Sequence, residues 1–406
     1  MFNFALRKIF QILTEKVARL EILYYEKLIE GGPNHEFFMA CQKTLDNIKA
    51  EILSNKELLL QSYHYPLGEE HLGRSLFSVK KSIVGFLQLH TLLGYLPQNN
   101  VLPESFTFLD KSLNGNNKIL ETKSRYIFLT RDYLYETQNF HDLVFNSEFA
   151  NDLGLCIPRV ENVNPLYWVL LVKNAFLNIV EKMDLQTIVN EIIGDRNLTS
   201  ERRYLLQILG QKLVLDVFAL RLFGPAYFYM MVEHGVFKRI AESEKIYLST
   251  LAVREELMYE QLVKYNMADQ ANATHGWFTH SGKLAEPLYT AFGFREDYSD
   301  IKDLLNSLIE RLNTEVVNKL GESALFIQAD LDNSLTANHK LHHNEDITGI
   351  LHNPKQIANA GWIYKETRLD KLFLEFLESE NNDFSIIGNS FRNLDNTIIT
   401  AISELV

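Results

Sequence analysis

Apolar residues recur at intervals of three and four along most of this chain, which is the pattern of helices that bury one face. The first thirty residues carry one such stripe, formed by Leu6, Phe10, Leu13, Val17, Leu20, Tyr24 and Leu28. Gly31 and Pro33 end it, and similar stripes cover residues 41–52 and 72–86, the last stopping at Gly94. Because the stripes break at each turn, they favour an intramolecular antiparallel bundle over an intermolecular coiled coil.

The pattern changes after the third stripe. Residues 97–120 are polar and rich in turn formers, which predicts a linker or long loop, and short β-like segments follow at 126–130 and 155–158. Asn164 and Pro165 then form a helix start, and the segment after them is apolar on nearly every side, which predicts a buried helix. A helix capped by Thr199 or Ser200 is expected to run up to a break or kink at Gly224-Pro225. Four further helices are expected beyond it, near residues 237–270, 299–320, 367–380 and 389–405.

Composition narrows the class of function. A formal net charge of −12 repels phosphate backbones, so no nucleic-acid partner is expected. Cys41 and Cys156 are the two cysteines, too few for a disulfide framework or a structural zinc knuckle, and they suggest buried thiols in a reducing compartment. No run of 18 apolar residues occurs, so we expect no membrane span and a cytoplasmic protein.

Two segments carry a resemblance to a known family. They are PRVENVNPLYWVLLVKNAFLNIV, from Pro158, and KLVLDVFALRLFGPAYFY, from Lys212. With Thr274-His275 further on, they resemble a poorly characterised bacterial group of zincin-like metalloproteases over roughly residues 150–290. In that group an apolar helix begins after Asn-Pro and carries H-E-x-x-H, and a second helix carries an acidic residue pattern before G-P-A. The resemblance implies a zincin-like helical core.

The fold class expected is therefore mainly α, a multi-helix protein whose zincin-like core carries a small strand element. Three regions are predicted from the breaks in the pattern and from the resemblance. They are an N-terminal helical bundle at residues 1–120, a degenerate zincin-like core at 121–270 and a C-terminal helical region at 271–406.

The chain departs from the family pattern at the positions of the zinc ligands and of the general base. Zincins bind Zn²⁺ through two histidines one helical turn apart and use the intervening glutamate as general base. Here Lys173, Asn174 and Leu177 stand at those positions, Lys212 replaces an acidic residue on the second helix, and Asp216 alone is kept. A protonated lysine offers no lone pair and leucine cannot coordinate, so we expect no catalytic residues, no metal and no cofactor.

Asp216 is flanked by apolar residues, so its carboxylate is expected to be buried, and a buried charge needs a partner. Lys212 lies one turn away on the same helix, and Lys173 lies on the facing helix. We predict a cross-helix ion pair of Lys173 with Asp216. The alternative is that Lys173 extends to solvent while a backbone or tyrosine donor satisfies Asp216.

Two histidine-rich segments are further candidates. His339, His342 and His343 lie in NHKLHHNED and could bind a metal, although a solvated loop is the default interpretation. His275 and His280 flank Trp277 in THGWFTH, which could be a functional loop or an aromatic plug tying the loop to the core.

The leading hypothesis is a non-catalytic interaction, regulatory or scaffolding subunit with an unidentified protein partner. A place in a bacterial multi-protein assembly, of an antiviral-defence type, is implied only by the family that the sequence resembles. The competing hypothesis is a metal-dependent hydrolase that uses Asp216 with the histidine-rich segments. Motifs for nucleotide-binding loops, nucleophile elbows and kinases are lacking in the sequence.

Overall fold

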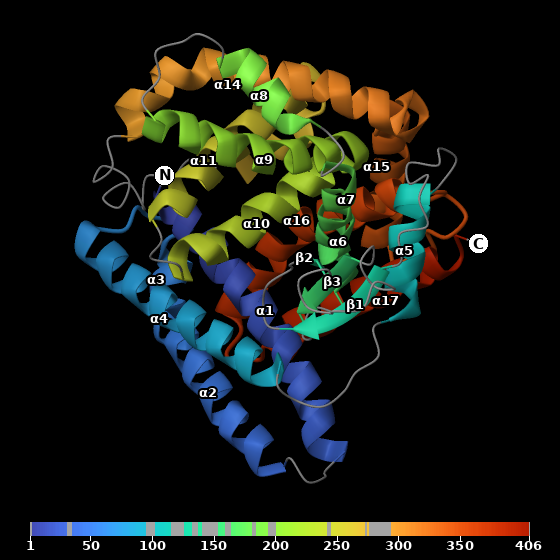
Figure 1. Ribbon diagram of the computed structural model, residues 1–406. Helices are drawn as coiled ribbons and strands as arrows, with labels where there is room; N and C mark the ends of the chain where they lie inside the picture. Colours follow the sequence, from blue (N-terminus) through green and yellow to red (C-terminus); the bar gives the residue numbers. More distant parts are fainter. Residues whose placement is uncertain are drawn as a thin grey trace.

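Helices form most of the described chain in the computed structural model (Figure 1), which confirms the mainly α class. The described residues are 2–30, 35–94, 102–114, 126–131, 137–139, 153–158, 164–180, 184–193, 200–241, 245–272, 274–275 and 294–405. Within them, no helix has the length and apolar character needed to span a bilayer.

The N-terminal part is helical, as the stripes predict for residues 2–94, but the segment 97–120, expected to be a linker or long loop, contains a helix at 103–114. Its elements are α1 (Phe2–Glu30), α2 (His35–Ser54), α3 (Lys56–Gln61), α4 (Glu69–Gly94) and α5 (Pro103–Asn114). The stripe of α1 is fully buried from Leu6 to Leu20, and α2 packs antiparallel to α4. Asn55, at the end of α2, donates to Ser78 Oγ and accepts from Ser75 Oγ, both at 2.9 Å, which satisfies the buried amide.

A three-stranded sheet lies beside these helices. It consists of β1 (Tyr126–Arg131), β2 (Thr137–Asn139) and β3 (Leu153–Pro158), in the order β1-β3-β2. β1 runs parallel to β3 with Tyr126 opposite Leu153, and β2 runs antiparallel to β3. Pro158 is the last residue of β3, a position where a missing N–H donor does least harm to the ladder.

The middle of the chain supplies the apolar helices. They are η4 (Pro165–Tyr167), α6 (Trp168–Ala175), α7 (Leu177–Val180), α8 (Leu185–Ile193), α9 (Ser200–Phe223), α10 (Pro225–Ala241) and α11 (Lys245–Lys264). The long helix expected after Asn164 is divided, because Phe176 N–H closes a tight turn on Lys173 O at 3.2 Å and separates α6 from α7. The expected break at Gly224 is present, with a φ of 54°.

The C-terminal part corrects two expectations. Its elements are α14 (Phe294–Leu320), η6 (Glu322–Ala324), α15 (Gln328–His342), α16 (Pro354–Glu378) and α17 (Ser385–Ser403). The histidine-rich segment 338–346 was expected to be a loop, but residues 338–342 form the end of α15. The helix expected at 367–380 begins much earlier, because Asn353 caps it by accepting from Gln356 N at 2.9 Å and Pro354 fixes its first turn.

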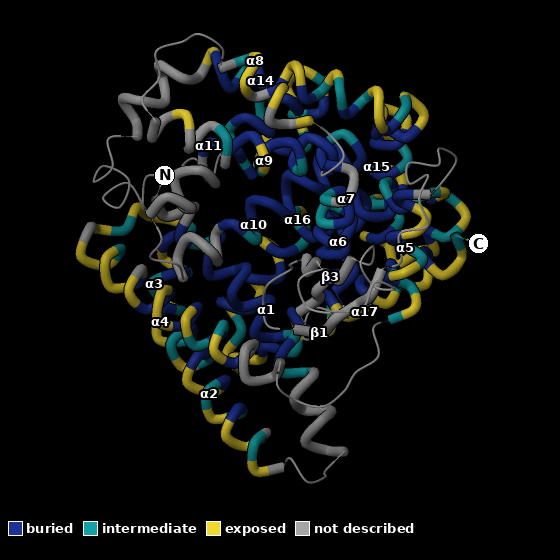
Figure 2. Tube along the Cα trace, viewed as in Figure 1, coloured by how far each residue is buried: buried dark blue, intermediate teal, exposed yellow. Residues whose placement is uncertain are grey.

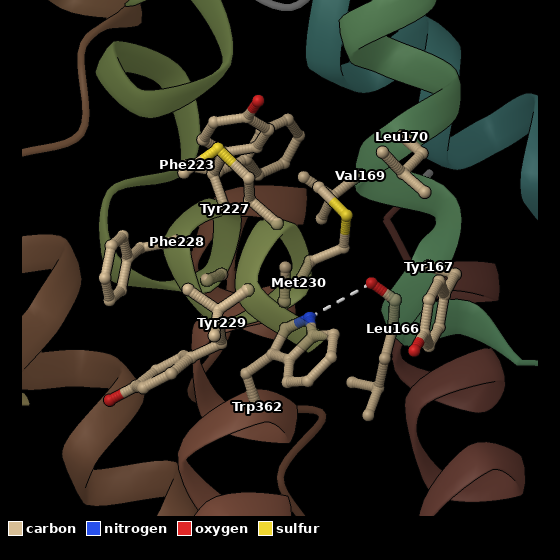
Figure 3. Close-up of a cluster of buried hydrophobic side chains, with 14 of the residues drawn as sticks. Leu166, Tyr167, Val169, Leu170, Phe223, Tyr227, Phe228, Tyr229, Met230 and Trp362 are labelled. Atoms are coloured by element: carbon tan, nitrogen blue, oxygen red, sulfur yellow. Dashed lines mark hydrogen bonds between the residues drawn. The ribbon is translucent and has the colours of Figure 1, made fainter. Parts of the chain in front are cut away.

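One apolar core joins elements from all three regions predicted from the sequence. Its buried residues extend from Leu6 to Ile402, and Figure 2 shows the burial concentrated in α6, α10 and α16. At its centre, Trp362 Nε1 of α16 donates to the carbonyl oxygen of Leu166 at 3.0 Å, and Tyr229 of α10 stacks on the indole (Figure 3). The core therefore fixes α6, α10 and α16 against each other.

Candidate functional site

The predicted ion pair between α6 and α9 is present. Lys173 Nζ lies 2.7 Å from Asp216 Oδ1. Arg254 of α11 donates to the same carboxylate through two guanidinium nitrogens, Nε to Oδ2 at 2.5 Å and Nη2 to Oδ1 at 2.8 Å. The Tyr227 hydroxyl of α10 also donates to Oδ1. These four residues, named here the Asp216 cluster, join four helices at one carboxylate.

Burial and charge set the protonation states of the Asp216 cluster. Burial raises the pKa of the Asp216 carboxyl, but Arg254 and Lys173 more than offset this and hold the pKa well below its usual range. Burial, followed by the negative charge of Asp216, raises the pKa of Tyr227 well above its ordinary value. Asp216 is therefore ionised and Tyr227 remains a hydrogen-bond donor at neutral pH.

The cluster is suited to holding helices rather than to binding a metal. Both oxygens of Asp216 accept hydrogen bonds from cations, and Oδ1 accepts three donors. Two cations around one anion leave a local positive charge, which opposes a divalent cation. A metal at Asp216 would have to displace Arg254 and Tyr227, whose side chains are buried.

The other positions that the resemblance assigns to a metal site lie near Lys173 or Asp216 along their helices and do not complete a ligand set. Asn174 and Leu177 follow Lys173 along α6 and α7 and are half-buried. Lys212 is half-buried one turn before Asp216 on α9. Each offers an amide, an alkyl group or an ammonium where the family pattern has imidazole or carboxylate.

The histidines of α15 are only partly brought together. The rings of His339 and His343 are neighbours with centroids 4.5 Å apart, and His343 Nδ1 lies 2.8 Å from His339 O. His342 faces α16, with Nε2 3.0 Å from Thr367 Oγ1 and its ring against Tyr364. Burial and nearby Arg368 lower its pKa. Among the described residues, no three His, Cys, Asp or Glu side chains are placed to share a metal.

Of the THGWFTH segment, Thr274 and His275 belong to the described residues, and Thr274 Oγ1 donates to Glu366 Oε2 at 3.2 Å. His275 is the histidine of the pair that the structure describes. Its ring stacks flat on Tyr259 of α11, with centroids 3.6 Å apart, and Nε2 lies 3.0 Å from Glu256 Oε2. Trp277 and His280 lie outside the described residues. The contacts of His275 tie this end of the segment to α11.

A second buried charge cluster was not predicted from the sequence. Lys365 of α16 is fully buried, with Nζ 3.2 Å from Glu15 Oε2 of α1 and 2.7 Å from Glu233 Oε1 of α10. Arg19 of α1 pairs with both Glu15 and Asp395 of α17. We name these five residues the Lys365 cluster; they connect the first, central and last helices of the described chain.

The carboxyl groups of the Lys365 cluster differ in protonation. Burial raises the pKa of Glu15, yet Lys365 and Arg19 dominate and lower it to about 2. Burial raises the pKa of Asp395 to about 7 against the opposing effect of Arg19, and its Oδ1 is buried without a hydrogen-bond partner. Burial lowers the pKa of Lys365, but Glu15 and Glu233 bring it above its ordinary value.

Comparisons of the chain with family models, with curated proteins and with solved structures found no match. The resemblance to zincin-like metalloproteases therefore stays a hypothesis that rests on the sequence segments quoted above.

Proposed function

We propose that this chain is a non-catalytic interaction or regulatory subunit, built on a helical core related to metalloproteases that has lost its metal ligands. The observation that carries the proposal is the Asp216 cluster. The one acidic residue kept from the family pattern is held by Arg254, Lys173 and Tyr227 inside the core.

The proposal follows from what a zinc hydrolase needs. Its metal requires ligands with free lone pairs and a position open to water, and its general base must take a proton from that water. Lys173 instead places an ammonium at the carboxylate, and Asn174 cannot act as a base at neutral pH. Asp216, with its pKa well below the usual range, is a poor proton acceptor in any mechanism.

The remaining role for such a core is mechanical. The Asp216 cluster fixes α6, α9, α10 and α11 relative to one another, so the outer surfaces of these helices keep a constant shape. A rigid helical surface suits recognition of a protein partner. A cytoplasmic location belongs to this proposal through the two cysteines and the lack of a long apolar run in the sequence. A bacterial assembly and a defence role belong to it through the family resemblance alone.

Metal analysis of the purified full chain tests the proposal. We expect less than stoichiometric zinc by elemental mass spectrometry and no peptidase activity that a chelator abolishes. The variant Lys173→His/Asn174→Glu/Leu177→His restores the H-E-x-x-H pattern and should gain zinc if the family resemblance is correct.

The control separates the two histidine regions. Zinc that is lost on His339→Ala/His343→Ala would belong to the end of α15 and would leave the proposal intact. About one zinc per chain, bound tightly and lost on Asp216→Asn, would overturn it. A tagged chain isolated from its native cells should carry a protein partner in constant ratio, whereas a chain that runs alone and hydrolyses peptides contradicts the proposal.

A further inference from the structure

The outer side of α4 exposes large apolar side chains. Phe77 is 73% exposed and Val84 is 37% exposed, and Tyr65, in the turn that precedes the helix, is 73% exposed. Figure 2 shows α4 at the edge of the molecule with exposed residues along its outer side. Burying an exposed phenylalanine against a partner is favourable, because it removes apolar surface from water.

The exposed residues form one line. Glu70, Phe77 and Val84 are seven residues apart, so they lie within a narrow strip of the helix surface. The opposite face of α4, including Val79 and Ile83, is buried against α1 and α2. The packing of α4 within the chain therefore leaves the side chains of Phe77 and Val84 exposed.

The strip has no side chain one turn before Phe77. Gly73 is one turn earlier, is exposed, and has no atom within 4 Å of the position that a Cβ would occupy. The helix backbone is therefore accessible at this point, and an approaching aromatic ring would meet no side chain. The strip thus contains both a projecting ring and a space that would accept one.

We propose that α4 pairs antiparallel with α4 of a second copy of this chain about a two-fold axis. In such a pair, residues whose numbers add to the same total lie opposite each other. Phe77 opposite Gly73 and Lys80 opposite Glu70 share one register. Each match occurs twice, because the axis exchanges the two copies.

Charge supports a second copy as the occupant. Glu70 is exposed near the start of α4, where it pairs with Arg74 of its own helix, and Lys80 is exposed in the middle. The antiparallel register brings the opposite charges of Glu70 and Lys80 together across the axis, at both ends of the Phe77 contact. Phe77 and Gly73 form the apolar pair, and Glu70 and Lys80 form the charged pair. All four residues lie on α4, so a second copy of this helix supplies every complementary group. This proposal does not rest on the absence of catalysis.

The experiment measures the mass of the full chain in solution. Light scattering after size exclusion and sedimentation equilibrium should give a dimer that dissociates on dilution. Phe77→Ser should weaken the dimer by at least about tenfold in Kd, since it removes the ring from the centre of the interface. The matched control is Phe106→Ser on α5, which removes a phenylalanine that is 44% exposed and should leave the mass unchanged.

Charge reversal tests the register. Lys80→Glu alone should weaken the dimer by placing like charges together, and so should Glu70→Lys, whereas the double variant should recover affinity. Circular dichroism confirms that each variant is folded. A wild-type chain that is monomeric into the submillimolar range overturns the proposal, as does a dimer indifferent to Phe77→Ser. A double variant no tighter than the single variants also overturns it, as does a monomer that uses Phe77 to bind a different protein.

Discussion

Removing the carboxylate of the Asp216 cluster is the sharpest perturbation of the core. In Asp216→Leu, the buried Arg254 and the half-buried Lys173 both lose this carboxylate, and the Tyr227 hydroxyl loses the same acceptor. Stranding a buried charge costs about 3–5 kcal/mol of unfolding free energy. We expect the cost of Asp216→Leu to lie within that range, because Arg254 is buried and loses both of its bonds to the carboxylate.

The same geometry ranks the other variants. Lys173→Met leaves both oxygens of Asp216 bonded to Arg254, so about 1–3 kcal/mol is expected for one lost charged hydrogen bond. Lys173→Met/Asp216→Leu still leaves the buried Arg254 without this carboxylate. The triple variant that adds Arg254→Met removes every charge of the cluster and should be more stable than Asp216→Leu alone, since apolar replacements often match a buried ion network.

Denaturant unfolding of the full chain, followed by circular dichroism, measures these costs. Lys264→Met is the control, because Lys264 pairs with Glu310 on the surface and should change stability by no more than about 1 kcal/mol. The reasoning fails if Lys173→Met costs as much as Asp216→Leu. It also fails if the triple variant is no more stable than Asp216→Leu.

Two further predictions concern the Lys365 cluster and the packing of α16. Because the folded-state pKa of Asp395, about 7, exceeds its ordinary 3.8, its stabilising contribution is present below the unfolded pKa and is lost as the pH rises through 7. Asp395→Asn, which stays neutral, should therefore gain stability relative to the wild type between about pH 5 and 8 in denaturant titrations, and a constant difference would contradict this. A Cβ on Gly361 would lie 2.5 Å from Ile398 Cδ1 and 2.6 Å from Leu166 Cδ2, so Gly361→Ala should cost about 1–3 kcal/mol in thermal unfolding. Gly349→Ala, with nothing within 4 Å, should be near neutral, and equal losses at both sites would refute the packing argument.

The Lys173–Asp216 pair could be predicted because two independent signals agreed. The apolar surroundings of Asp216 required a counter-charge, and the family pattern placed Lys173 on the facing helix. Arg254 was missed for a physical reason. It stands beside Glu255 and Glu256 in α11, and such a charged run usually covers a solvated face. Only the packing of α11 on α9 turns Arg254 inward, and no local pattern records that contact.

The start of α16 and the whole of α15 were not predicted from the sequence, for different reasons. Asn353-Pro354 is the same helix-start signal as Asn164-Pro165, so the beginning of α16 could have been predicted from the sequence. α15 was harder to find, because its buried face includes Ser334 and Ala337 beside its leucines and the hydrophobic contrast is weak. Ser334 is satisfied within the fold by bonds to Asp330 O and Gln356 O, which the sequence alone does not indicate.

The Lys365 cluster bears on how the chain is organised. Glu15 belongs to the first region defined from the sequence, Glu233 to the second and Lys365 to the third, and all three side chains are buried. Separating any region would leave a charge without its partner inside the core, at a cost comparable to much of the stability of an ordinary domain. The three regions are therefore expected to fold together. The charged residues of α1 explain why: Glu15 and Arg19 interrupt an apolar helix at the places where α16 and α17 supply the opposite charges.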